Sequence, residues 1–118
     1  MNVQKLAKVF GIVFILIGVL GFVPGVTTNG HLLGVFEVDT LHNVIHLLTG
    51  IVAWLAASSS SNSKLFFKVF GVVYLLVTIL GFTMGGDILG LFMVNMADNL
   101  LHLVIAVVAL WAGFMSKG

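Results

Sequence analysis

Residues 39–50 read Asp39-Thr40-Leu41-His42-Asn43-Val44-Ile45-His46-Leu47-Leu48-Thr49-Gly50. This stretch places two histidines and an asparagine at the start of a segment that is otherwise apolar enough to cross a membrane. His42 and His46 are four residues apart, so on an α-helix they lie one above the other on the same face. Ionisable groups inside a membrane helix are costly, which makes these two side chains candidates for function.

The composition of the whole chain argues against a water-soluble globule. Of its 118 residues, 60% are hydrophobic and 8% are charged, whereas a soluble domain carries about 25% charged residues. The chain has no arginine, the residue whose planar fork usually binds phosphate, and we therefore expect no nucleic-acid partner. It also has no cysteine, which excludes thiolate metal sites and thiol catalysis.

The chain contains four apolar runs, one of which begins within this stretch. Each is close to the roughly 20 residues that a helix needs to cross the hydrocarbon of a bilayer, and they cover Gln4–Val23, Thr40–Ala57, Lys64–Thr83 and Met96–Met115. None has the short alternating pattern of a barrel strand. We therefore predict an all-α membrane protein with four transmembrane helices in a single domain, residues 1–118. The serine-rich segment Ser58–Ser63 is predicted to be a flexible linker.

The two halves of the chain are tandem repeats of one another. The matching segments are Lys8–Gly11 with Lys68–Gly71, Leu20–Phe22 with Leu80–Phe82, Leu33–Val38 with Leu89–Val94, and His42–Leu47 with Asp98–Leu103. Each copy, about 4–57 and 64–115, contains two spans, so both copies enter the membrane in the same direction. The sequence therefore predicts a pseudo-two-fold four-helix bundle built from two helical hairpins.

Charged side chains divide between the two ends of the predicted spans. The lysines fall at one end (Lys5, Lys8, Lys64, Lys68 and Lys117) and the acidic residues at the other (Glu37, Asp39, Asp87 and Asp98). The positive-inside rule then predicts that both termini and the linker are cytoplasmic. The outer links contain short apolar segments, 32–36 and 88–92, which we expect to lie in the interface or to fold back over the bundle. Asp39 and Asn95 suit the N-cap positions of the second and fourth helices.

The pseudo-symmetry predicts a side-chain cluster at the outer end of the second and fourth helices. If their polar stripes face each other, His46 lies opposite His102, and His42 lies opposite Asp98. Three imidazoles and one carboxylate would then converge, which is a donor set that suits a first-row transition metal ion.

Three interpretations of this cluster remain open. It could be a hydrogen-bonded polar network that pins helices together, or a metal site formed by His42, His46, Asp98 and His102. It could also hold haem or another tetrapyrrole through His46 and His102 as axial ligands. Asn43 and Asn99 recur in both copies and are candidates either for orienting an imidazole or for binding the backbone of the outer links.

Residues 33–50 resemble the hallmark of a small bacterial family with four membrane spans. The core of the resemblance is Leu41-His42-Asn43-Val44-Ile45-His46-Leu47, and it extends over essentially the whole chain. The family is catalogued as domain of unknown function 4383. The resemblance implies a four-helix protein of the bacterial cell membrane, or of the thylakoid membrane in a cyanobacterium, and implies no activity. This chain has Asp39-Thr40 where that family often has Asn-Pro, a change that bears on the helix cap.

The preferred functional hypothesis is a non-catalytic binding protein in the lipid bilayer, with a metal ion at the histidine cluster. The alternative is a structural or accessory subunit that packs on a larger membrane complex. The third hypothesis, a small transporter or proton conduit, is disfavoured because the deeper helix positions carry no acidic or basic residue. The chain has no G-x-S-x-G, no phosphate-binding loop and no H-E-x-x-H, so no enzyme signature contradicts the preferred hypothesis.

Overall fold

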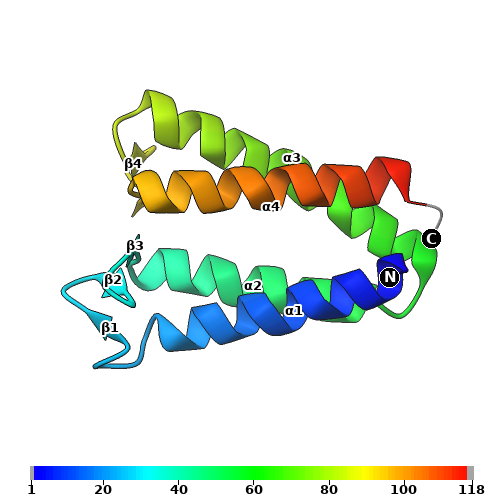
Figure 1. Ribbon diagram of the computed structural model, residues 1–118, viewed down its shortest axis with the longest axis horizontal. Helices are drawn as coiled ribbons and strands as arrows, with labels where there is room; N and C mark the ends of the chain where they lie inside the picture. Colours follow the sequence, from blue (N-terminus) through cyan, green and yellow to red (C-terminus); the bar gives the residue numbers. More distant parts are fainter. Residues whose placement is uncertain (1, 117–118) are drawn as a thin grey trace.

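The computed structural model describes residues 2–116, which form four α-helices and five two-residue strands (Figure 1). The helices are α1 (Val3–Leu20), α2 (Thr40–Ala56), α3 (Ser60–Thr83) and α4 (Met96–Met115). The strands are β1 (Thr27–Thr28), β2 (His31–Leu32), β3 (Phe36–Glu37), β4 (Asp87–Ile88) and β5 (Phe92–Met93). The mostly helical architecture with four helices is confirmed.

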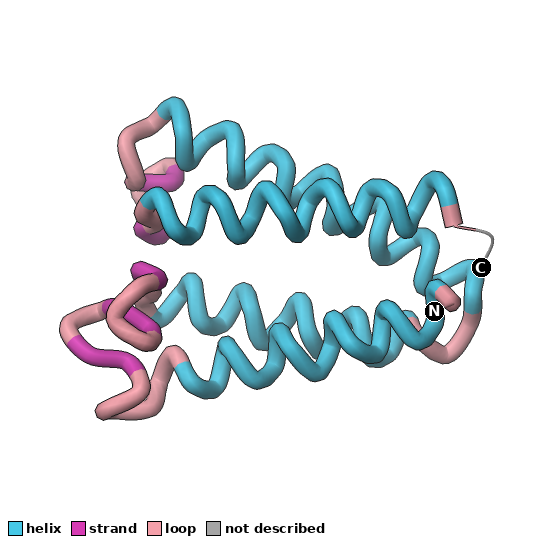
Figure 2. Tube along the Cα trace, in the orientation of Figure 1, coloured by secondary structure: helices cyan, strands magenta, loops and turns pink. Residues whose placement is uncertain are grey.

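The helices pack as two pairs, α1 with α2 and α3 with α4, and the pairs lie side by side (Figure 1). The strands all lie at the end of the molecule that is opposite the two termini (Figure 2). We call this the strand end. The other end holds Lys5 and Lys8 of α1 and Lys64 and Lys68 of α3, and we call it the lysine end. Lys117 lies outside the described residues.

Three of the helices, α1, α3 and α4, are long and apolar enough to cross a membrane. The 17 residues of α2 rise about 26 Å, which is slightly less than the hydrocarbon thickness of about 30 Å. Large apolar side chains are exposed along the outside of every helix, for example Leu16, Leu48, Leu76 and Val104. Such an outer surface is compatible with a lipid bilayer.

Side chains at the helix N-termini explain where α2 and α4 begin. The Asp39 carboxylate accepts a hydrogen bond from the His42 backbone N–H (2.8 Å), and the Asn95 side-chain oxygen accepts one from the Asp98 backbone N–H (2.9 Å). Each bond satisfies a donor that the first helical turn would otherwise leave free. The two predicted N-caps are therefore confirmed.

The predicted linker at Ser58–Ser63 is wrong in its extent, because α3 begins at Ser60. The Ser59 hydroxyl caps the helix by accepting from the Asn62 backbone N–H (3.0 Å). The Ser63 hydroxyl lies 2.8 Å from the Ser59 carbonyl and 3.1 Å from the Ala56 carbonyl. These serines therefore start a helix and join it to the end of α2, and only residues 57–59 separate α2 from α3.

The outer links form antiparallel β-hairpins, which the sequence analysis did not anticipate. Strand β2 pairs with β1 and β3, and β4 pairs with β5. The turn after β2 has positive φ at Leu33 (55°) and Gly34 (71°), and the turn after β4 has the same pair at Leu89 (54°) and Gly90 (74°). Two successive positive φ angles are typical of the tight type I′ turn that joins hairpin strands.

The core at the lysine end is an apolar layer in which both helical pairs meet. Phe67 of α3 has no exposed surface, and it packs with small side chains from the other three helices, namely Ala7, Ala53, Ala109 and Ala112. Alanine lets helix backbones approach closely, and the rings of Phe67 and its buried neighbour Phe66 fill the remaining space. The core at the lysine end is therefore apolar and rests on close contacts between helices.

Candidate functional site

Three histidine side chains meet at the strand end between the two helical pairs. His42 and His46 of α2 and His102 of α4 are only 1%, 4% and 1% exposed. One ligand atom from each lies within 4.8 Å of the others. The ring centroids are separated by 4.5 Å (His42–His46), 5.5 Å (His42–His102) and 6.0 Å (His46–His102). The structure thus brings together all three of the histidines that the sequence analysis singled out.

Hydrogen bonds that cross between the two halves hold the starts of α2 and α4 together. The second oxygen of Asp39, at the start of α2, accepts from the Met93 backbone N–H in β5 (2.9 Å). The Asn95 amide, at the start of α4, donates to the Val35 carbonyl just before β3 (2.9 Å). Each N-cap residue therefore binds the hairpin of the opposite half. This arrangement fixes the helix starts from which the histidines project.

The hydrogen bonding of His42 determines which of its ring nitrogens can act as a ligand. Its Nδ1 lies 3.2 Å from the Met93 carbonyl oxygen; since a carbonyl can only accept, Nδ1 carries the proton. In the neutral ring, Nε2 then has a free lone pair. Metal-binding histidines commonly donate their other ring N–H to a carbonyl in this way.

Several nitrogens of the cluster lack hydrogen-bond partners within residues 2–116. These buried atoms are Nε2 of His42, Nδ1 and Nε2 of His46, and Nδ1 of His102. Buried polar atoms in folded proteins are nearly always paired, so a concentration of unpaired ones calls for an explanation, such as an ion or a ligand.

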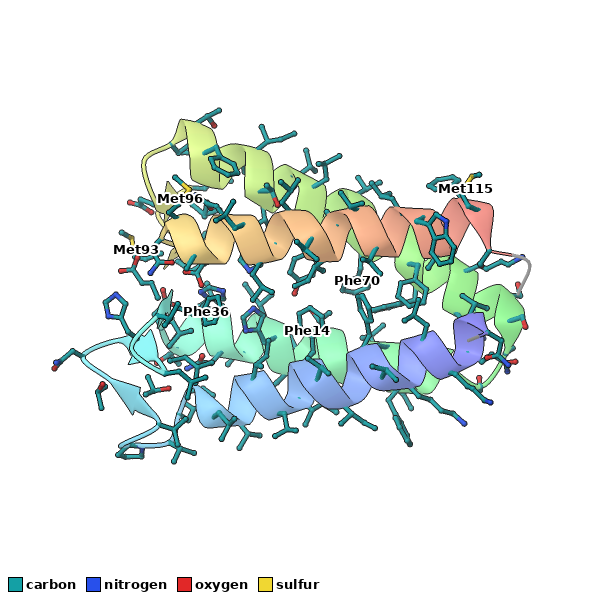
Figure 3. The ribbon with its side chains drawn as sticks, viewed as in Figure 1. Phe14, Phe36, Phe70, Met93, Met96 and Met115 are labelled. Carbon is teal, nitrogen blue, oxygen red and sulfur yellow. The ribbon has the colours of Figure 1, made fainter. Side chains whose placement is uncertain are left out.

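Two aromatic rings enclose the cluster on the side that faces the middle of the molecule. The Phe14 ring of α1 lies 5.6 Å from the His46 ring, and the Tyr74 ring of α3 lies 5.5 Å from the His102 ring. Phe14 and Phe70 point into the space between the two pairs (Figure 3). The hydroxyl of Thr49 donates to the Ile45 carbonyl (2.8 Å), so the Tyr74 hydroxyl, 3.0 Å away, donates to Thr49.

Tyr74 was not predicted from the sequence to be part of the site. A signal was available, because Tyr74 follows Lys68 by six residues just as Phe14 follows Lys8. The two rings are therefore counterparts in the repeat, and they lie 5.5 Å apart. Tyr74 is the single tyrosine of the chain, and its counterpart in the other repeat is an inward-facing phenylalanine. A ring that carries a hydroxyl at such a position indicates a polar site in the core.

Asp98, the predicted fourth ligand, is buried (2% exposed) but does not belong to the group of close ligand atoms. Its carboxylate accepts from the Asn95 backbone N–H (3.0 Å) and completes a capping box at the start of α4. The ring of His42 faces His102 and Phe92. Asp98 therefore shapes the helix start, and one of its oxygens is already used for that purpose.

Asn43 and Asn99, the candidates for orienting an imidazole, pack against glycines of the preceding helices. A Cβ added at Gly21 would clash with the Asn43 side-chain oxygen, and one added at Gly81 would clash with the Asn99 side-chain oxygen. Both asparagines are buried. The geometry thus favours a packing role for each amide within its own helical pair.

A cavity of about 310 Å³ lies directly beside the histidines. His42, His46 and His102 line it together with Tyr74, and apolar side chains form the rest of its wall: Ile45, Val73, Val77 and Phe92. Val73 is 43% exposed, so the cavity reaches the outer surface between α2 and α3. A ligand bound by the histidines would have room next to it.

Comparison with known families identifies the chain. No curated protein and no solved structure matches it significantly. The family model described as Domain of unknown function (DUF4383) matches residues 4–115, nearly the whole chain. The resemblance noted for residues 33–50 is thereby confirmed, and the chain belongs to the DUF4383 family.

Proposed function

We propose that this protein is a four-span membrane protein that binds a first-row transition metal ion through His42, His46 and His102. In this proposal it is a binding protein of the bacterial cell membrane rather than an enzyme. The observation that carries the proposal is the convergence of three buried imidazoles whose ligand atoms lie within 4.8 Å of one another. Neutral imidazole suits zinc, copper, iron and nickel.

The ring spacing supports a metal centre quantitatively. An imidazole nitrogen binds such ions at about 2.0–2.1 Å, which puts neighbouring ring centroids about 5 Å apart in a tetrahedral arrangement. The observed separations of 4.5, 5.5 and 6.0 Å bracket that value. The ligand atoms lie within 4.8 Å of one another, against about 3.4 Å for nitrogens around a tetrahedral ion, so each ring would move inward by up to about 1 Å. The hydrogen bond from His42 Nδ1 to the Met93 carbonyl would hold one ring in the required orientation.

The membrane topology that we propose follows from charge and from matched features of the two halves. The lysine end would face the cytoplasm together with both termini, and the strand end would face outward. The two halves share N-caps at Asp39 and Asn95, asparagines packed against Gly21 and Gly81, and Leu-Gly turns in their hairpins. These matches support a duplicated helical hairpin, in which α2 is the shortest span.

A tetrapyrrole held by His46 and His102 has less support. Its flat macrocycle would lie between the two rings, around their midpoint. The His42 ring centroid is only 4.5 Å from His46 and 5.5 Å from His102, so it occupies the space that the macrocycle needs. A metal ion without a macrocycle does not need this space between the His46 and His102 rings.

The second candidate is a structural role, in which the cluster holds the bundle together inside a larger membrane complex. The hydrogen bond between His42 and Met93, which joins the two halves, favours it. The unpaired nitrogens favour the metal, because a purely structural polar network gains stability only when its members are paired.

Cobalt(II) binding to the purified protein tests the proposal, because cobalt in an imidazole site absorbs in the visible. We expect one ion per chain, with binding lost in His42→Leu, His46→Leu and His102→Leu. His31→Leu is the matched control, because His31 lies in β2 and bonds the Asn29 carbonyl (2.9 Å). Asp98→Asn should still bind cobalt if Asp98 acts only at the helix cap. Stoichiometric binding that survives all three cluster substitutions would refute the proposal.

A further inference from the structure

Two hollows lie between α2 and α3, one beside the histidines and the other nearer the lysine end. A second cavity, of about 410 Å³, lies between α2 and α3 and is lined by Val52, Leu55, Ala56, Asn62, Leu65, Phe66, Val69 and Phe70. Its Val69 and Phe70 lie one helical turn before Val73 and Tyr74 of the first cavity. From Phe66 to Val77 the two together follow about 16 Å of helix axis. We use the name groove for the face between α2 and α3 that carries these two apolar hollows, the first of which is bordered by the three buried imidazoles.

The charge of the proposed centre indicates what kind of head group the groove would accept. A divalent ion held by three neutral imidazoles keeps its full double charge in an apolar surrounding, which is costly unless an anion joins it. Both oxygens of Asp39 are occupied by backbone N–H groups, and Asp98 bonds the Asn95 N–H. Asp98 keeps a second oxygen, but among the described residues no carboxylate belongs to the group of close ligand atoms. An anion that completes the centre would have to enter through the cavity.

We propose that the groove between α2 and α3 binds a long-chain carboxylate, a fatty acid taken from the bilayer. Its carboxylate occupies the open coordination position of the metal, and its chain lies along α3 from Val77 towards Phe66. A three-histidine centre with one open position is the arrangement that binds an exogenous ligand. This inference rests on the proposed metal site, and it adds the ligand class and its route of access from the lipid.

The visible spectrum of the cobalt-loaded protein in phosphatidylcholine nanodiscs tests this inference. We expect laurate to change the spectrum, because a carboxylate oxygen enters the coordination shell. Dodecanol has the same chain without the carboxylate and should leave the spectrum unchanged. Acetate should act only at much higher concentrations than laurate, because it lacks the chain that the groove binds.

Two neighbouring substitutions on α3 locate the chain. Val73 lines the cavity, so Val73→Trp should fill it and weaken the apparent affinity for laurate by about tenfold or more, as overpacking typically costs 1–3 kcal/mol. Val72 is similarly exposed (47% against 43%) but does not line the cavity, so Val72→Trp should leave the affinity unchanged. Both variants should bind one cobalt ion.

The outcomes separate this inference from the proposed function. A protein that takes up no cobalt fails the proposed function, and this inference falls with it before any laurate is added. A protein that takes up cobalt but does not respond to laurate, or responds equally to dodecanol, refutes this inference alone. Equal effects of Val73→Trp and Val72→Trp would likewise refute the assignment of the groove.

Discussion

The two ends of the bundle are built on opposite principles. At the lysine end, Phe67 and four alanines, which together come from all four helices, form an apolar layer. At the strand end, three imidazoles face one another with unpaired nitrogens, and a cavity of about 310 Å³ opens beside them. Packing of the first kind contributes stability, whereas the second leaves polar atoms unsatisfied, which costs stability.

This difference indicates that the two ends of the helices have different roles. The lysine end holds the two helical pairs together, and the hydrogen bonds of Asp39 and Asn95 to the opposite hairpins align them at the other end. Between these two attachments the helices can carry a site that does not stabilise the apo protein. Ligand-binding sites are commonly held in this way by a rigid scaffold, whose stability offsets the loss of folding free energy at the site.

The largest expected effect on stability comes from the lysine end. Phe67→Ala removes the most deeply buried ring of this layer and should lower the free energy of unfolding by about 3 kcal/mol, near the lower limit for Phe→Ala in soluble cores. The lower limit applies because lipid, rather than water, is the reference for an apolar side chain in a membrane. Reversible unfolding in mixed micelles, followed by circular dichroism, measures the change. Cobalt stoichiometry in the folded fraction should stay at one.

The second-largest expected effect on stability comes from a metal ion that binds at the strand end. A metal ion that binds only the folded state should raise the free energy of unfolding by about 2.7 kcal/mol when its free concentration is a hundred times its Kd. Zinc is suitable for this measurement, which uses the same unfolding assay. His46→Leu should lose this gain, while His31→Leu should keep it. An equal gain in both variants would show that zinc acts outside the cluster.

The helices and their caps could be predicted from the sequence because their signals are local. The apolar runs gave four helices, and Asp39 and Asn95 were identified as N-caps from their positions at the starts of two runs. The spacing Asn95-x-x-Asp98 also matches a capping box, in which the fourth residue returns a bond to the first. Reading Asp98 as a metal ligand overlooked this local use, which the structure displays.

The features that could not be predicted depend on contacts between distant residues. The short hairpins lie in segments that are too apolar to look like turns, although Gly34 and Gly90 have the positive φ that such turns require. The partner of His42 is the Met93 carbonyl, 51 positions away. No sequence pattern specifies which backbone carbonyl an imidazole meets, and hence which nitrogen remains free. The repeat predicted that the histidines converge, but the protonation pattern required coordinates.

A smaller expected loss of stability tests the hydrogen bonds that join the two halves at the strand end. Asp39→Ala removes both the cap of α2 and the bond to Met93, and it should cost about 1–2 kcal/mol, the upper part of the range for N-cap substitutions. Asp39→Asn retains one oxygen acceptor and should cost less. Asp87→Ala is the control, because within residues 2–116 the Asp87 carboxylate accepts from its own turn, from the Gly90 N–H (2.9 Å). Equal losses in Asp39→Ala and Asp87→Ala would mean that the tie to the opposite hairpin contributes little.

The smallest expected change in stability best separates a metal site from a structural role of the histidines. In the metal-free protein, His46→Leu replaces two unpaired buried nitrogens with an apolar side chain of similar size, so the free energy of unfolding should stay within about 0.5 kcal/mol or rise. The same unfolding assay, run with a chelator present, measures it against wild type. A structural role predicts the opposite sign, because a ring that pins the helices would be lost. If His46→Leu destabilises the metal-free protein more than Asp39→Ala does, the strand end is stabilised by its histidines, and the contrast between the two ends fails.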